Sequence, residues 1–176
     1  MALLSHSHHL EMWCTMHTFK FSKFGRVYIP LFIKPRKGTT LYPVDFKVDT
    51  GCDTTTISKG DLFDLGYDNN WINKNIIVFK DEDKPKTASG EKVNAGYVQL
   101  PLANVLGYEA KYWPFQIIID EDKDFPNLLG RDLLTGFNYD FNNDNDILTV
   151  RRTDAFKPRY QFLPKQEIHE VDIIHT

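Results

Sequence analysis

Residues 27–33 and 44–48 carry the pattern that most constrains the fold, because their aliphatic side chains fall at alternate positions. In a β-strand such alternation puts the apolar side chains on one face. Pro30 favours an edge position for the first strand, since proline cannot donate a ladder hydrogen bond. Residues 35–38 contain the Pro and Gly of a turn. We therefore expect a hairpin whose second strand ends at Asp49, on the face opposite its apolar side chains.

The rest of the chain repeats this arrangement in outline. The order of strand, hairpin, strand, special loop and short helix occurs twice, although the two halves share little sequence. Ser58 with Asp61 resembles a capping box, and Gly66 is suited to end that helix. The pattern predicts a mostly β domain with a pseudo-twofold internal repeat and one or two short helices. The expected strands are 76–79, 97–102, 112–119 and 147–150, the expected helices 58–65 and 131–137, and residues 104–107 are expected in a turn.

Composition excludes several classes of function. The formal net charge is −3, whereas a nucleic-acid or anionic-membrane surface needs a basic excess. No apolar run approaches the roughly 20 residues that cross a bilayer. Two cysteines are too few for a disulfide framework. We expect a cytoplasmic protein that binds neither nucleic acid nor membrane.

The 176 residues suit one domain with short extensions. We expect residues 1–23 to form a flexible N-terminal arm, 24–152 the folded domain, and 153–176 a C-terminal extension. His6, His8 and His9 lie in the arm and could bind a metal, but no further ligands follow at suitable spacing. A loose polar arm is the competing interpretation, and we expect no metal site.

The chemistry concentrates at Asp49-Thr50-Gly51, where a strand ends at a carboxylate and the chain turns at once. Gly51 permits a close backbone approach that a Cβ would block. Two such carboxylates held about 3 Å apart share one proton, so that one acts as a base and the other as an acid. Three residues alone are weak evidence, since such a string occurs by chance in roughly 3 of 100 chains of this length. A simple hairpin-ending turn is therefore a competing interpretation.

A second segment, 128–134, follows about 75 residues later with the sequence LLGRDLL. Together, the hydrophobic–Asp–Thr–Gly–x–Asp segment and the two-hydrophobics–Gly–Arg–Asp segment resemble the retropepsin family of aspartic proteases. The resemblance covers the layout of residues 27–150. It implies an acid-protease half-barrel with a flap hairpin, in which Gly130 and Arg131 support the site.

Residue by residue, the resemblance implies that Asp49 is the catalytic carboxylate and that Thr50 hydrogen-bonds across a dimer axis. Gly51 would present its carbonyl to the substrate backbone. Asp53 would accept hydrogen bonds from the substrate main chain and pair with Arg131, a geometry that guanidinium suits better than ammonium.

The flap implied by the resemblance is residues 87–97, with Ser89 and Gly90 at its tip and in contact with substrate. A hairpin of this kind closes over a substrate and excludes water. Because residues 80–86 obscure the register, a surface hairpin without a gating role is the alternative. Cys52 stands where the family usually has alanine. It is interpreted as a small semi-buried residue or, alternatively, as a site of oxidative control.

Asp-Thr-Gly occurs once in the chain, and one carboxylate cannot supply both base and acid. We therefore expect a homodimer with Asp49 of each copy at a twofold axis. Residues 168–174 contain enough aliphatic side chains for one strand, either pairing with the partner or lying in a loose tail.

The predicted function is an aspartic endopeptidase that needs no cofactor, works best at mildly acidic pH and cleaves extended polypeptides. Ile57, Ile118 and Leu128 suggest tolerance for hydrophobic substrate side chains. The alternatives are a catalytically silent retropepsin-like module that dimerises or binds peptides, and an unrelated all-β domain.

Overall fold

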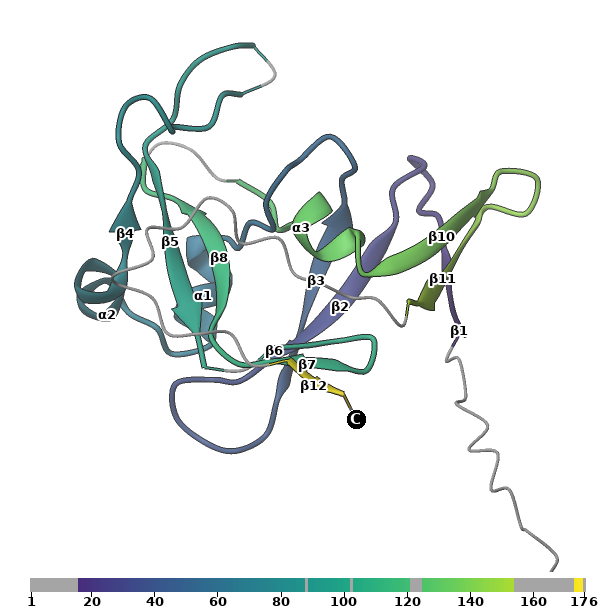
Figure 1. The fold of residues 1–176 in the computed structure, drawn as a ribbon, viewed down its shortest axis with the longest axis horizontal. Helices are drawn as coiled ribbons and strands as arrows, with labels where there is room; N and C mark the ends of the chain where they lie inside the picture. The colour runs from purple at the N-terminus through teal and green to yellow at the C-terminus, as the bar shows by residue number, and fades with distance from the viewer. Residues whose placement is uncertain (1–15, 88, 102, 121–124, 154–172, 176) are drawn as a thin grey trace, which may run out of the picture.

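The computed structural model describes residues 16–87, 89–101, 103–120, 125–153 and 173–175. These residues form twelve strands and three short helices, so the expected mostly β class is confirmed. The strands belong to three sheets that do not close into a barrel, and the elements lie in an elongated arrangement (Figure 1). In chain order the elements are β1 (Met16–Lys20), β2 (Tyr28–Ile33), β3 (Tyr42–Val48), α1 (Lys59–Asp64), α2 (Asn69–Asn75), β4 (Ile77–Val78), β5 (Ala95–Leu100), β6 (Ala103–Val105), β7 (Tyr108–Ala110), β8 (Trp113–Ile118), β9 (Leu128–Leu129), α3 (Arg131–Leu134), β10 (Phe137–Asn142), β11 (Ile147–Arg152) and β12 (Ile173–His175).

The expected first hairpin is present as β2 and β3, which pair antiparallel along their whole length. Their alternating apolar side chains are buried in the main core, as Ile29, Leu31 and Phe46 illustrate. On its other side β2 pairs with β6 only at Phe32 and Ile33. Pro30 therefore sits where a missing amide hydrogen costs no ladder hydrogen bond.

The central sheet has the order β12-β7-β6-β2-β3-β9. Its last pair is parallel, with Lys47 opposite Leu128 and Val48 opposite Leu129. Thr56 then forms bridges to both Leu128 and Gln116, so the chain after β3 runs between β9 and β8. This arrangement brings residues 47–56 and 128–132 side by side.

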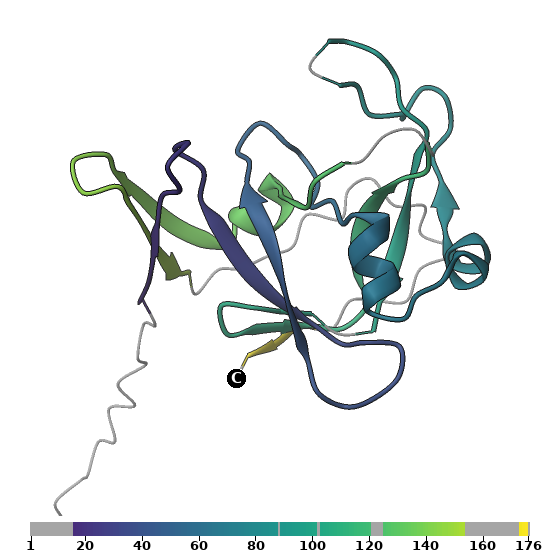
Figure 2. The same ribbon diagram turned by 180° about the vertical axis from the view of Figure 1, so that it is seen from behind.

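A second sheet, β4-β5-β8, lies at one end of the molecule beside the two longer helices (Figures 1 and 2). Val98 and Phe115 point from it into the main core, while Val93, Ala95 and Ile118 form a smaller apolar cluster with Phe79. This smaller cluster anchors the base of the hairpin that joins β4 to β5.

The third sheet, β1-β11-β10, lies at the opposite end. The prediction of a flexible arm extending to residue 23 is wrong for β1, which pairs with β11 from Met16 to Lys20. β10 was not expected either. β1 shows no apolar alternation, whereas the β10 sequence FNYDFN alternates aromatic and polar residues, a strand signal that the sequence interpretation did not use. Residues 1–15, which include His6, His8 and His9, lie outside the described residues.

The helices follow local capping signals. The Ser58 side chain accepts a hydrogen bond from the Asp61 amide at the start of α1, as expected, and Gly66 after its end has a φ of +84°. α3 ends at Leu134, three residues earlier than predicted, because β10 begins at Phe137. α2 was not predicted, although the Asp68 side chain caps it.

The region expected as a turn at residues 104–107 is a complete hairpin, β6 to β7. It turns at Leu106 and Gly107, whose φ values are both positive. The C-terminal strand was expected to pair with a partner copy or to lie in a loose tail. At Ile173–His175 neither holds, because β12 pairs with β7 of the same chain. Within the described residues no helix is long and apolar enough to cross a membrane.

Candidate active site

The loop that follows β3 holds the Asp49 side chain in one orientation. The Gly51 amide donates to Asp49 Oδ1 at 3.0 Å, and the Cys52 amide donates to the Asp49 carbonyl at 3.2 Å. The Asp49 amide in turn donates to the Leu129 carbonyl at 3.1 Å. The Asp49 side chain is 33% exposed and Thr50 is exposed, so the carboxylate is fixed from below and open to solvent above.

Lys47 is a neighbour of Asp49 that sequence reasoning did not assign to the site. Its Nζ lies 3.6 Å from Asp49 Oδ2. The two residues are separated by one position on the same strand, so their side chains share a face. That spacing was a signal in the sequence. In a single chain, the carboxylate therefore faces an ammonium group.

The second segment of the resemblance holds the loop through backbone hydrogen bonds made by its residues 128–132. The Arg131 amide donates to the Cys52 carbonyl at 2.8 Å, and the Asp132 amide donates to the Asp53 carbonyl at 3.1 Å. Gly130 makes this approach possible, because a Cβ there would lie 2.5 Å from the Thr54 carbonyl carbon. Its φ of −87° is open to any residue, so the requirement for glycine is one of space.

Beneath the loop, Asp132 and Thr55 form a buried polar pair that the sequence interpretation missed. The Thr55 amide and hydroxyl donate to the two Asp132 carboxylate oxygens at 3.0 and 2.7 Å. The Thr55 hydroxyl also accepts from the Gly130 amide at 3.2 Å. Burial raises the pKa of Asp132, and the hydrogen bonds from Thr55 and Leu133 oppose that rise. Asp132 is therefore a structural support of the loop.

Asp53 and Arg131 form the ion pair implied by the resemblance, through Asp53 Oδ1 and Arg131 Nη2. The Asp53 carboxylate raises the pKa of Arg131. Both side chains are more than half exposed, so the pair orients the two groups and adds little to stability.

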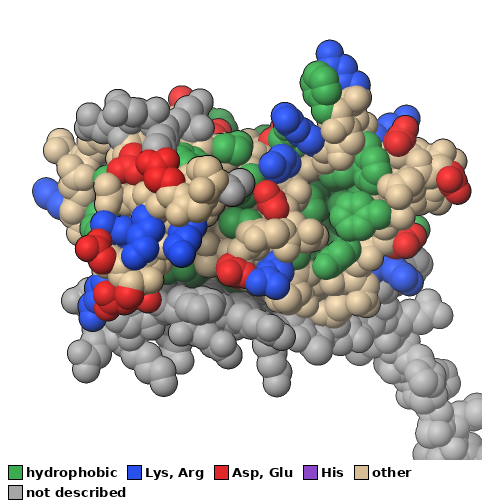
Figure 3. Space-filling model, turned by 90° about the horizontal axis from the view of Figure 1, so that it is seen from above, with side chains coloured by type: hydrophobic (Ala, Val, Ile, Leu, Met, Phe, Trp, Pro, Cys, Tyr) green, Lys and Arg blue, Asp and Glu red, His purple; other side chains and the backbone are tan. Residues whose placement is uncertain are grey.

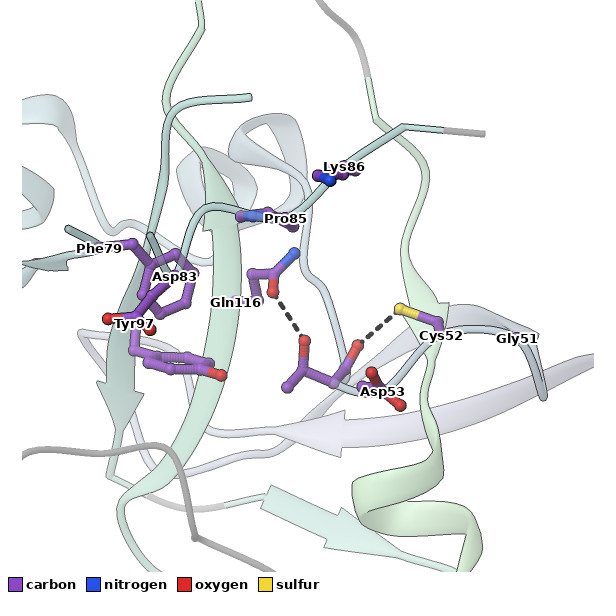
Figure 4. Close-up of a pocket in the computed structure, with 10 residues that line it drawn as sticks. Gly51, Cys52, Asp53, Phe79, Asp83, Pro85, Lys86, Tyr97 and Gln116 are labelled. Atoms are coloured by element: carbon purple, nitrogen blue, oxygen red, sulfur yellow. Dashed lines mark hydrogen bonds between the residues drawn. The ribbon is translucent and has the colours of Figure 1, made fainter. Parts of the chain in front are cut away.

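A cavity of about 570 Å³ opens beside the loop, next to Gly51 and Asp53 (Figure 4). Its floor is the loop, and its wall is the β4-β5-β8 sheet with the chain that leads into the hairpin. The lining residues are Gly51, Cys52, Asp53, Thr54, Phe79, Asp83, Pro85, Lys86, Tyr97 and Gln116.

The predicted flap is only partly where the sequence interpretation put it. Ser89 and Gly90 do form an exposed turn, in which the Gly90 amide donates to the Thr87 carbonyl at 2.8 Å. Neither of these two residues lines the cavity. The chain before the tip does, since Pro85 and Lys86 contribute to its wall. Residue 88 lies outside the described residues.

Several lining residues were given no site role from the sequence, among them Phe79 and Gln116 of the second sheet and its flanking chain. Gln116 carried a readable signal, because it is a single amide within the apolar run of β8. Ile57 and Ile118, which suggested hydrophobic specificity, are buried and do not line the cavity.

Cys52 is half-buried, and its Sγ donates to the Thr54 carbonyl at 3.0 Å. Burial, together with the charges of Asp49 and Asp132, raises the pKa of this thiol. Because the thiolate is the form that oxidises, these surroundings favour the interpretation of Cys52 as a small packing residue over oxidative control.

Among the described residues, no three His, Cys, Asp or Glu side chains are grouped to hold a metal ion. Comparisons with protein-family models, with curated proteins and with solved structures each find no match to this chain.

Proposed function

We propose that this protein is a retropepsin-like aspartic endopeptidase in which Asp49 from each of two copies forms one active site. The observation that carries the proposal is the clamped loop. An exposed carboxylate at a strand end is oriented by the Gly51 amide and held from below by residues 128–132. Aspartic proteolysis needs such rigidity, because two carboxylates must stay close enough to share a proton.

The order of elements supports the family assignment. β3 leads through the Asp49 loop to α1, and β9 leads through Gly130 to α3, with β3 and β9 paired side by side. This order is consistent with the repeat of strand, loop and short helix that the resemblance implies. The hairpin between β4 and β5 stands on the side of the cavity where a flap would close.

The surface around the loop supports pairing of two copies. Exposed hydrophobic side chains gather on one half of the face seen in Figure 3, towards the end that holds β10 and β11. Tyr139 and Phe141 of β10 are more than 40% exposed, with ring centroids 5.8 Å apart. Tyr139 lies near enough to Arg131 to interact with its charge, and exposed Tyr28 pairs with Lys47. A second copy seated here would bury apolar surface beside Asp49.

In the paired site, one Asp49 carboxylate takes a proton from a water molecule, whose oxygen forms a bond to the scissile carbonyl carbon. The other, protonated Asp49 gives its proton to the carbonyl oxygen. The Asp49 that took the proton from water then gives it to the leaving nitrogen as the carbon–nitrogen bond breaks, and one hydroxyl of the intermediate returns its proton to the other Asp49, which restores the shared proton. Lys47 would have to move from its place 3.6 Å from Asp49 Oδ2 for the second carboxylate to approach.

That lysine favours a second candidate, a peptide-binding module without catalysis. If the Lys47–Asp49 ion pair persists in the dimer, the lysine occupies the side from which the second carboxylate must approach, so the two carboxylates cannot share a proton. The cavity could then still hold an extended peptide through strand-like backbone hydrogen bonds.

Subunit mixing tests the proposal. A fixed amount of wild-type protein is titrated with Asp49→Asn protein, and cleavage of a peptide library is followed at pH 4–7. With equal amounts of each chain, about a quarter of the dimers have two wild-type copies, so the activity per wild-type chain falls to about half. Lys74→Ala protein, altered at an exposed position of α2 outside the cavity lining, serves as the control and leaves activity unchanged.

Activity that does not respond to added Asp49→Asn protein would contradict a shared site. A folded wild-type dimer that binds peptides but cleaves none would instead favour the silent module. Lys47→Met separates the two candidates further, because removal of the ammonium restores proton sharing if the ion pair alone had prevented catalysis.

A further inference from the structure

We infer that the cavity beside the Asp49 loop selects a substrate side chain that ends in a carboxamide, as in asparagine or glutamine, and that Gln116 recognises this group by a hydrogen bond. This inference rests on the proposed function for its substrate, an extended peptide, and adds the chemistry of one position in that peptide.

Gln116 is 93% buried, since its exposed fraction is 7%, and it lines the cavity. The Thr54 hydroxyl donates to Gln116 Oε1 at 2.7 Å, which fixes the orientation of the amide. The Nε2 group then points away from Thr54 towards the space below Pro85 and Lys86 (Figure 4). Within the described residues Nε2 has no hydrogen-bond partner.

Gln116 is buried as a residue, but its Nε2 opens on the cavity, so a ligand that displaces water there must replace the hydrogen bond of this donor. A ligand oxygen at this position would supply the missing acceptor, while an aliphatic side chain of the same size would leave Nε2 dry and unpaired. Sites built to hydrogen-bond a polar group reject apolar analogues in this way. The hydrophobic specificity suggested by the sequence is therefore replaced by a polar one.

The rest of the cavity wall limits the size and charge of the ligand group. Tyr97 pairs with Gln116 across β5 and β8, and Phe79 packs edge-on against Tyr97 with ring centroids 4.6 Å apart. These rings bound a slot for a short, flat group. Carboxylates of Asp53 and Asp83 and the ammonium of Lys86 share the lining, so a negatively charged ligand meets more repulsion than attraction. A neutral carboxamide satisfies Nε2 without that repulsion.

The test uses eight-residue peptides in which one position at a time carries Gln, Met, Asn, Leu, Glu or Lys. Binding to full-length Asp49→Asn protein is measured by fluorescence anisotropy, and cleavage by wild-type protein is measured as kcat/KM. At one peptide position, we expect Gln over Met and Asn over Leu by about tenfold to a hundredfold. The two residues of each pair have similar size, so a difference in binding between them reports the carboxamide group and not the side-chain volume.

Two variants assign the preference to Gln116. Gln116→Glu keeps the acceptor for the Thr54 hydroxyl but replaces the free donor with an acceptor, so the preference shifts to Lys. The double variant Thr54→Val, Gln116→Leu replaces both bonded partners with apolar groups of similar shape, a change that folds with little penalty, and its preference shifts to Met and Leu. Gln99→Leu, on β5 outside the cavity lining, keeps the wild-type preference.

The outcomes separate the inference from the proposed function. Carboxamide-selective binding without cleavage supports the inference while the protease proposal fails. Cleavage that depends on Asp49 but treats Gln and Met alike at every position overturns the inference and leaves the protease standing. A preference for Lys in the wild-type protein also overturns it, because the Gln116 amide would then present its oxygen to the cavity.

Discussion

Replacement of Gly130 by alanine tests whether the Asp49 loop depends on close backbone contact. The added Cβ would lie 2.5 Å from the Thr54 carbonyl carbon, 2.6 Å from its oxygen and 2.8 Å from the Thr55 nitrogen. An ordinary contact begins near 3.4 Å, so the two segments must separate by about 0.9 Å. All three atoms belong to the backbone and cannot swing aside.

The expected cost has two parts. Overpacking of this kind typically costs about 1–3 kcal/mol. The separation also stretches the bonds from the Arg131 amide to Cys52 and from the Gly130 amide to the Thr55 hydroxyl, at about 1 kcal/mol each. We expect the free energy of unfolding to fall by about 2–5 kcal/mol, which lowers the urea midpoint by about 1–2 M.

Urea unfolding followed by tryptophan fluorescence and circular dichroism measures this loss, and Gly60→Ala is the matched control. Gly60 lies within α1, is exposed, and a Cβ there would meet only the Ser58 hydroxyl at 3.7 Å. Alanine at this position should stabilise the protein by about 0.5–1 kcal/mol, because it favours the helix. A Gly130→Ala midpoint as high as that of wild type would refute the described packing of residues 128–132 on the loop.

Three further results are expected. Asp132→Asn places an amide nitrogen against a Thr55 donor and lowers the free energy of unfolding by about 1–3 kcal/mol. Burial raises the folded-state pKa of Asp132 above its ordinary 3.8, so the free energy of unfolding of the wild type falls as pH rises from the ordinary pKa to the raised one. The difference in stability between wild type and Asp132→Asn should therefore shrink from pH 4 upward. A difference in urea midpoints that grows with pH would contradict this. Burial raises the pKa of Tyr67 to about 12, so absorbance titration shows this phenol ionising above the ordinary range of tyrosine. Wild type therefore loses stability above pH 10, and Tyr67→Phe loses less. Arg131→Ala changes the free energy of unfolding by less than about 1 kcal/mol, since its ion pair with Asp53 is exposed, and a larger drop in urea midpoint would contradict the exposed geometry.

The parts of the fold that could be predicted from the sequence are those with local signals. The alternation of β2 and β3 and the capping residues of α1 were sufficient, because each depends on neighbours in the chain. α2 is different, since its sequence NNWINKN has poor helix propensity. Burial of Ile72 and the contact of Trp71 with the Tyr67 ring, at 4.5 Å between centroids, stabilise it instead. Such tertiary contacts cannot be predicted from the local sequence pattern.

The candidate site likewise has a part that the local sequence predicts and a part that depends on tertiary structure. Asp49, Gly51, Asp53 and Arg131 could be chosen from the sequence because they belong to two short motifs. The cavity could not, since Gln116 faces it only through the register of β8 with β5. The hairpin tip was misassigned because which of its residues line the cavity depends on how the chain before the tip folds back.

The parallel pairing of β3 with β9 also sets when the Asp49 loop can form during synthesis. Lys47 pairs with Leu128, 81 residues later in the chain. At about 5–20 residues per second, the ribosome adds that stretch in about 4–16 s. Until then, the carbonyl of Leu129 and the amides of Arg131 and Asp132 are absent, so nothing holds the loop from below. A nascent chain therefore exposes the Asp49 sequence long before it has the geometry described above.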